Sequence, residues 1–156
     1  MSVRTESLYE CDYYQWLTET VNCLKARDFT NLDLKNLIEE IEELGRREKY
    51  AIASYLMRLC EHLLKLQYWE TERQRCYRGW LVEVRNFRKE IKRRLQASPS
   101  LKPWIQDIYV EEYRNGRQLF LDGSGLASDA IPETPPFTLA QALDENWLPA
   151  DLTGVG

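Results

Sequence analysis

The sequence predicts an all-α protein, a single helical bundle of about four main helices with an irregular C-terminal arm that carries one short helix. Two observations support this prediction. Apolar side chains recur at steps of three and four along most of the chain, and the alternation typical of a strand is nowhere sustained. At 156 residues the chain has the length of one domain and can bury a real core.

The longest predicted helix runs from Asp33 to Trp69. Its apolar positions share one face of a helix that turns about 100° per residue, and they are Leu34, Leu37, Ile41, Leu44, Ile52, Leu59, Leu63 and Leu66. The face stays in phase across Gly45, which indicates one long helix, kinked there at most. Beyond Gly45 the opposite side is apolar as well, so the second half should be the buried central rod of the bundle.

Three other main helices are expected around this rod. The first spans 12–27, and the third begins near Trp80 and ends at Ala97, where Ser-Pro-Ser disfavours continuation. The fourth spans about 100–122, with a proline in its first turn, where the missing N–H costs little. The polar stretch 70–79, between the long helix and the third, is expected to be irregular.

The C-terminal part changes to a composition of Gly, Pro, Ser and Asp, which rules out a long helix. Thr138 and Gln141 have capping-box spacing, which predicts a short helix over about 139–144. The arm, residues 123–149, is too apolar for a free tail and is expected to lie across the bundle. We therefore expect one domain over 1–149, followed by a flexible tail over 150–156.

The sequence also indicates a compartment. No signal peptide and no apolar run of membrane-spanning length is visible, which predicts a cytoplasmic protein without a membrane partner. The four cysteines are scattered, without a C-x-x-C pair, so they are interpreted as reduced thiols rather than as disulfides or zinc ligands.

Ionisable residues interrupt the apolar faces of the helices. Glu48 and His62 lie on the face of the long helix, Arg88 on that of the third and Glu112 on that of the fourth. Burying an unpaired charge costs several kcal/mol, so these four are expected to converge in one buried polar cluster. Such a cluster is either a structural salt-bridge network or a ligand pocket between helices. Gly116, one turn beyond Glu112, is expected to let another helix approach closely.

Metal and catalytic sites are not predicted. The chain has one histidine, and Leu59 stands where a Glu-x-x-His metal motif needs glutamate. The sequence therefore predicts no metal, no cofactor and no catalytic residue.

A row of basic residues faces away from the apolar stripe of the third helix. It consists of Arg85, Lys89, Lys92 and Arg93. Such a row is either a solvated face or a surface that binds nucleic acid through phosphates. The formal net charge of −4, and the lack of a Gly-rich phosphate loop or a helix-turn-helix pair, speak against nucleic acid without excluding it.

The aromatic content exceeds what a small core needs. Five tryptophans and nine tyrosines are present, and both residue types are favoured at interfaces. The arm could cover them, or they could form the surface of a homodimer or of a complex with a protein partner.

Several segments resemble the domain-of-unknown-function 29 family. They are NLIEEIEELGRRE (36–48), EHLLKLQYW (61–69), SPSLKPW (98–104), and PFTLAQAL (136–143) followed by NWLP (146–149). The resemblance implies an all-helical fold and an origin among small bacterial proteins, abundant in cyanobacteria, and it implies no activity. The family tends to have Trp-Arg where this chain has Trp80-Leu81, so a role for that arginine does not carry over.

The sequence favours a non-enzymatic protein-interaction or regulatory module, of which an antitoxin-like protein is one form. The alternative is an enzyme or ligand-binding protein that uses the polar cluster. Nucleic-acid binding through the basic row is the third hypothesis.

Overall fold

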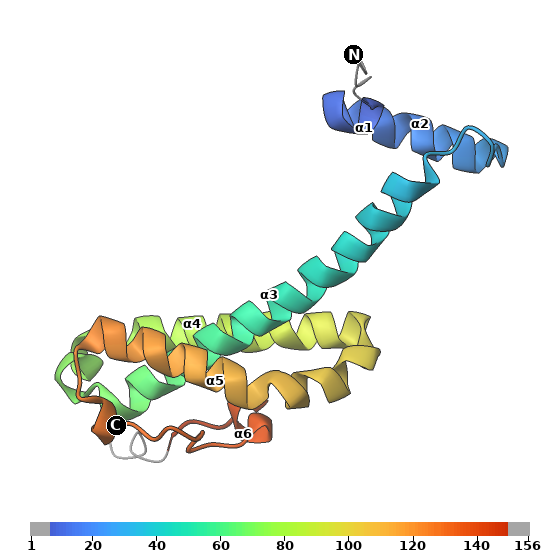
Figure 1. Cartoon of the computed structure of the whole chain (residues 1–156). Helices are drawn as coiled ribbons and strands as arrows, with labels where there is room; N and C mark the ends of the chain where they lie inside the picture. The colour runs from blue at the N-terminus through green and yellow to red at the C-terminus, as the bar shows by residue number, and fades with distance from the viewer. Residues whose placement is uncertain (1–6, 150–156) are drawn as a thin grey trace. The chain divides into compact units, whose positions relative to one another are not determined.

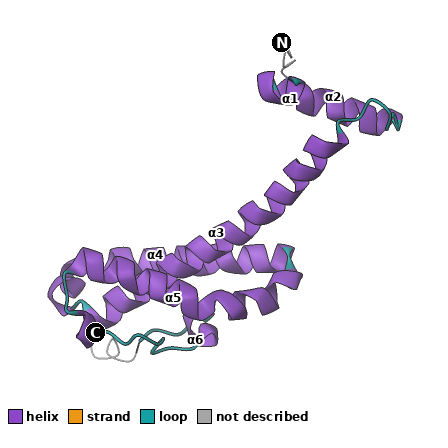
Figure 2. Cartoon of the chain, viewed as in Figure 1, coloured by secondary structure: helices purple, strands orange, loops and turns teal. Residues whose placement is uncertain are grey.

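The computed structural model describes residues 7–149, and every regular element in that range is helical (Figures 1 and 2). The all-α prediction is therefore confirmed. The elements are α1 (Leu8–Cys11), α2 (Tyr13–Ala26), α3 (Leu34–Tyr68), α4 (Glu70–Ala97), η1 (Pro99–Leu101), α5 (Lys102–Ser124), η2 (Ser128–Ala130) and α6 (Leu139–Leu143). None of these helices is long and apolar enough to cross a membrane.

The chain forms two compact units, residues 1–47 and 48–156, and the division falls inside α3. Length alone predicts one domain over 1–149. The first half of α3 offers a physical reason for the division. One side of it carries the charges of Glu39, Glu42 and Glu43, and a charged side does not pack against further helices. Only α1 and α2 therefore share a unit with this half of the helix.

The first unit is a helical hairpin made of α2 and the beginning of α3. The Tyr13 hydroxyl of α2 donates a hydrogen bond to Glu40 Oε2 of α3 at 2.8 Å, whereas Trp16 Nε1, further along α2, donates to Asp33 Oδ2, next to the start of α3, at 3.0 Å. The partners run backwards along α3 as the chain advances, so the two helices are antiparallel. Trp16 and Thr20 are the buried residues of α2.

The second unit encloses the hydrophobic core between the second half of α3, α4, α5 and the arm. Its fully buried side chains include Ile52, Leu56, Leu63, Ile91 and Tyr113. The expected central rod is thus observed in the second half of α3.

The helix α4 begins at Glu70, ten residues earlier than predicted. Glu70 and Glu72 stand in its first turn, where the helix dipole favours acids. Cys76 and Tyr77 pack against the core. Gly79 is exposed inside the helix, and an interior glycine costs only about 1 kcal/mol, which these contacts offset. The expected irregular stretch is therefore helical.

The arm follows Gly125, whose left-handed φ of 69° ends α5. The predicted capping box of α6 is confirmed, because Thr138 and Gln141 bond reciprocally. Ile131 and Phe137 enter the core, and the hydroxyl of Tyr109 donates to the Phe137 carbonyl at 2.5 Å. The tail predicted over 150–156 lies outside the described residues.

Candidate functional site

The structure does not bring together the four residues predicted to form one polar cluster. Glu48 pairs with Arg94, at 2.9 Å between Oε2 and Nη1, and the Glu112 carboxylate accepts from the Asn115 amide at 3.4 Å. Within residues 7–149, no hydrogen bond or ion pair joins any two of the four. The reason is that nearby backbone carbonyls and neighbouring side chains satisfy each group, and helical periodicity does not show these partners.

Arg94 and Glu61 are charged residues of the second unit that sequence reasoning missed. The Arg94 guanidinium lies over the Tyr55 ring, 5.5 Å from its centroid, and Glu61 is buried between Arg58 and Lys65, both at 3.2 Å. Arg94 follows Ile91 by three residues, so its place near the apolar stripe is a signal that could have found it.

His62 is a buried histidine held by its own helix. Its Nδ1 lies 2.9 Å from the Arg58 carbonyl, which places a proton on that nitrogen, and its ring meets Phe87 edge-on. Burial lowers the pKa of His62 below its ordinary value. The second ring nitrogen therefore resists protonation, and the arrangement is that of a packed core residue.

The lowered pKa of His62 predicts a loss of stability in mild acid. The unfolded chain binds a proton near pH 6.5 that the folded chain resists, so the free energy of unfolding should fall as the pH drops from 7 towards 5.5. One such proton gives a slope of at most about 1.4 kcal/mol per pH unit. Urea denaturation at several pH values measures this slope.

His62→Gln is the control for this pH dependence, because the chain has no other histidine. Glu112 acts in the opposite direction: burial raises its pKa, so its protonation favours the folded state. The difference between wild type and His62→Gln isolates the histidine. Equal slopes in the two proteins would contradict the assignment.

Arg88 joins α4 to the arm. It is 4% exposed. Its Nε donates to the Ala142 carbonyl at 2.7 Å, and its Nη2 donates to the Trp147 carbonyl at 2.8 Å. The buried charge predicted at this position thus finds backbone acceptors instead of a carboxylate.

The predicted basic row lines one groove between α4 and the end of the arm. Arg85, Lys89, Lys92 and Arg93 all contribute to this groove of about 810 Å³, together with Arg88. The four residues of the row therefore line one hollow, and the opposite wall is formed by the arm, which sequence periodicity does not show. We call this hollow the basic groove.

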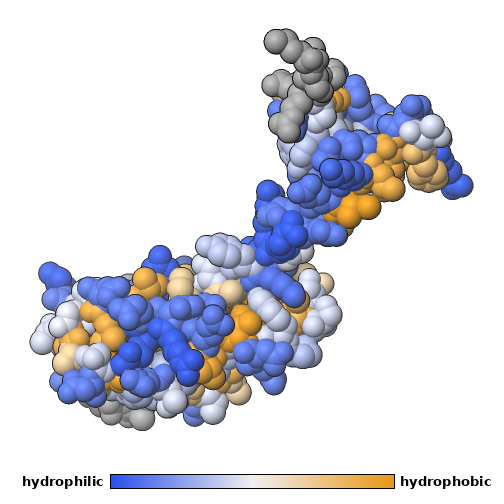
Figure 3. Space-filling view, in the orientation of Figure 1, coloured by the Kyte–Doolittle hydropathy of each residue, from blue (hydrophilic) through white to orange (hydrophobic). Residues whose placement is uncertain are grey.

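The first unit presents a second candidate surface, an apolar one. Six aliphatic side chains of the hairpin are 37–59% exposed. They are Leu17, Val21 and Leu24 of α2 and Leu34, Ile38 and Ile41 of α3, and we call them the hairpin face. Figure 3 shows apolar surface over this unit. Leu34 and Ile41 belong to the apolar face predicted for the long helix, whereas Ile38 was not among its predicted positions.

The two halves of the hairpin face lie on the same side. On each helix, the exposed residues lie about 100° around the helix axis from the residues that contact the other helix. This rotation has the same sense, in the direction of the chain, on both helices. The helices are antiparallel, so equal rotations bring both stripes to one side of the pair. The exposed residues therefore make one surface instead of two separate stripes.

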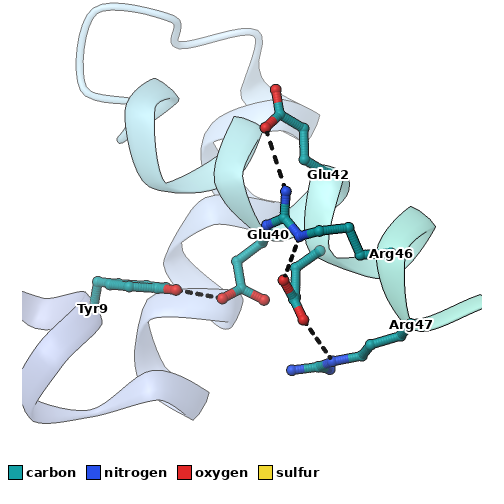
Figure 4. A network of polar contacts seen from close by, with 6 residues as sticks. Tyr9, Glu40, Glu42, Arg46 and Arg47 are labelled. Atoms are coloured by element: carbon teal, nitrogen blue, oxygen red, sulfur yellow. Dashed lines mark hydrogen bonds and ion pairs between the residues drawn. The ribbon is translucent and has the colours of Figure 1, made fainter. Parts of the chain in front are cut away.

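Paired charges cover another part of the hairpin (Figure 4). Glu43 accepts from Arg46 at 2.8 Å and lies 3.6 Å from Arg47, and Arg46 also reaches Glu42 at 3.9 Å. The hydroxyls of Tyr9 and Tyr13 converge on Glu40, and this carboxylate raises the pKa of Tyr9 to about 12. These charges are satisfied within the unit and stand beside the hairpin face as a polar border.

No metal site is formed by the described residues, since none of them make a group of three or more His, Cys, Asp or Glu that could hold an ion. The candidate surfaces are therefore the basic groove and the hairpin face.

Comparison with known proteins identifies a family. Residues 8–148 match the model of a family described as "Domain of unknown function DUF29". No curated protein and no solved structure matches the chain.

Proposed function

The chain belongs to the DUF29 family, and from the geometry of its first unit we propose that it is a non-enzymatic interaction module that pairs with a second copy of itself. The observation that carries this proposal is the hairpin face. Single exposed aliphatic residues are ordinary, but a contiguous apolar surface on a two-helix unit marks an interface.

The hairpin cannot cover this face from within its own unit. Of the residues in α2, only Trp16 and Thr20 are buried, and in α3 buried residues begin at Ile52. Two packed helices leave a side of each without a neighbour. A second hairpin placed against the first would give every helix two neighbours, as in a four-helix bundle.

A second copy is the occupant that the area and symmetry favour. The hairpin face exposes roughly 500 Å² of aliphatic surface, so two copies would remove on the order of 1,000 Å² from water, which reaches the lower bound for a specific interface. The two antiparallel helices contribute equally to the patch. Such a patch can pair with the same patch of a second copy about a twofold axis, and twofold dimers are the commonest oligomers. The paired charges around Glu43 would form the polar rim of the interface.

The role of such a dimer is regulatory in this proposal, with an antitoxin-like protein as one form: it would present two copies of the second unit to a target. Cys23, Cys60 and Cys76 are free thiols, which suits the reducing cytoplasm of a bacterial cell.

Ile41→Glu tests the proposal. The new carboxylate would stand within the interface, and burying it unpaired costs several kcal/mol, enough to weaken the dimer more than a hundredfold. Light scattering on a size-exclusion column should show a dimer for wild type and a monomer for the variant at the same concentration.

Val110→Glu is the matched control, since Val110 is a 42% exposed aliphatic residue of the second unit. This variant should remain a dimer. A wild-type monomer at high protein concentration, or equal effects of the two substitutions, would contradict the proposal.

A further inference from the structure

We propose that the basic groove of the second unit binds an acidic, amphipathic segment of a protein. The groove is independent of the hairpin face, because its lining comes from α4 and the end of the arm. Its volume of about 810 Å³ is far larger than a single phosphate needs, and lies in the range of ordinary ligand-binding pockets.

The charge of the lining selects an acidic ligand. Five cationic residues line the groove, namely Arg85, Arg88, Lys89, Lys92 and Arg93, against one acid, Glu145. Arg93 is paired with Glu90 at 2.8 Å. Arg85 and Lys89 have no ion pair within residues 7–149, and both are exposed. Their charge is available to a partner, and the one-sided lining would attract carboxylates over a distance of about a Debye length.

The length of the groove also fits a segment. From Arg85 to Gln96 the groove follows α4 over eleven residue steps, which is about 16 Å of helix. Five residues of an extended peptide, or three turns of a helix, span that distance. A bound segment could therefore place several acidic side chains against the row.

The apolar part of the lining distinguishes a peptide from a nucleic acid. Leu81, Val84 and Leu148 contribute apolar surface to the same groove. Aliphatic side chains of an amphipathic segment would cover this surface, whereas a phosphodiester backbone would leave it uncovered. Proteins that bind single strands stack the bases on aromatic rings, and no aromatic residue is among the lining.

The chain itself provides an example of the proposed contact. The carboxylate of Glu145 approaches the Lys92 ammonium to 3.4 Å from the arm side of the groove. Both side chains are 60% exposed, so a stronger acidic ligand can displace this pair. The groove thus already accepts a carboxylate from a peptide chain at its edge.

Fluorescence anisotropy with the full chain tests the inference. The probe is a labelled peptide of four Leu-Glu-Glu repeats in low salt. Two further probes are the same peptide with serine in place of leucine, and an oligouridylate of equal charge. We expect the Leu-Glu-Glu peptide to bind at least fivefold more tightly than either of them, with an affinity that falls as salt is added.

The double variant Arg85→Ala, Lys89→Ala should bind this peptide at least tenfold more weakly, since two unpaired cations are removed. The matched control is Arg78→Ala, Arg114→Ala, which removes two exposed arginines outside the groove and should bind within twofold of wild type. Circular dichroism confirms that both variants are folded. No binding of the peptide, an equal loss in both variants, or tighter binding of the oligouridylate would overturn the inference, the last in favour of nucleic acid.

Discussion

Replacing Gly116 by alanine is expected to lower the free energy of unfolding by at least about 2 kcal/mol, because the new methyl group has no room. A Cβ at this position would lie 2.5 Å from the Met57 carbonyl oxygen and 3.0 Å from the Glu61 nitrogen. Both atoms belong to the backbone of α3, so neither can move aside as a side chain would. Either α3 and α5 separate or the helix backbone distorts, and both reduce packing in the core.

The matched control for Gly116→Ala is Gly79→Ala. No atom lies within 4 Å of a Cβ built on Gly79, and alanine is the better helix former by up to about 1 kcal/mol. Urea denaturation should therefore show opposite signs, with Gly79→Ala slightly stabilising. Equal stability of Gly116→Ala and wild type would show that α3 and α5 do not pack as closely as described.

Arg88→Met is expected to cost about 3 kcal/mol and to release the arm. The substitution keeps much of the apolar stem but removes two charge-assisted hydrogen bonds, and it leaves the carbonyls of Ala142 and Trp147 without these donors. The effect should concentrate in the arm, because both acceptors lie there. Hydrogen exchange of residues 126–149 should accelerate more than that of α3.

Lys89→Met controls for the loss of a positive charge on α4, since Lys89 is exposed. It should change the free energy of unfolding by less than about 0.5 kcal/mol. Arg88→Lys should fall between the two, because a single ammonium cannot reproduce the fork that reaches two carbonyls. An arm that exchanges at the wild-type rate in Arg88→Met would contradict the role of anchor.

Local features of the fold were predictable from the sequence because their causes are local. The phase of apolar residues across Gly45 correctly indicates one continuous α3. The reciprocal bonds of Thr138 and Gln141 lie within one turn, so their spacing is sufficient to predict α6. The beginning of α4 is not predictable in this way, because its cause is not local. Residues 70–79 are polar, and their helix depends on contacts with the core.

The candidate sites were less predictable because they depend on distant partners. Arg88 was recognised as a buried charge, but its acceptors are 54 and 59 residues away in the chain. The exposure of the hairpin face also could not be predicted from the sequence. Helical periodicity marks Leu34 and Ile41 as apolar positions but does not say whether the chain itself covers them.

Cross-linking of an isotope mixture tests most directly the claim that two copies meet through the hairpin face. Light and heavy chains are mixed and treated with a lysine-specific cross-linker, so that a link between isotopes identifies a contact between copies. The account predicts mixed-isotope links among Lys25 and Lys35 of the first unit, which are exposed on the hairpin. Mixed links confined to Lys89, Lys92 and Lys102 of the second unit, or none at all, would contradict it.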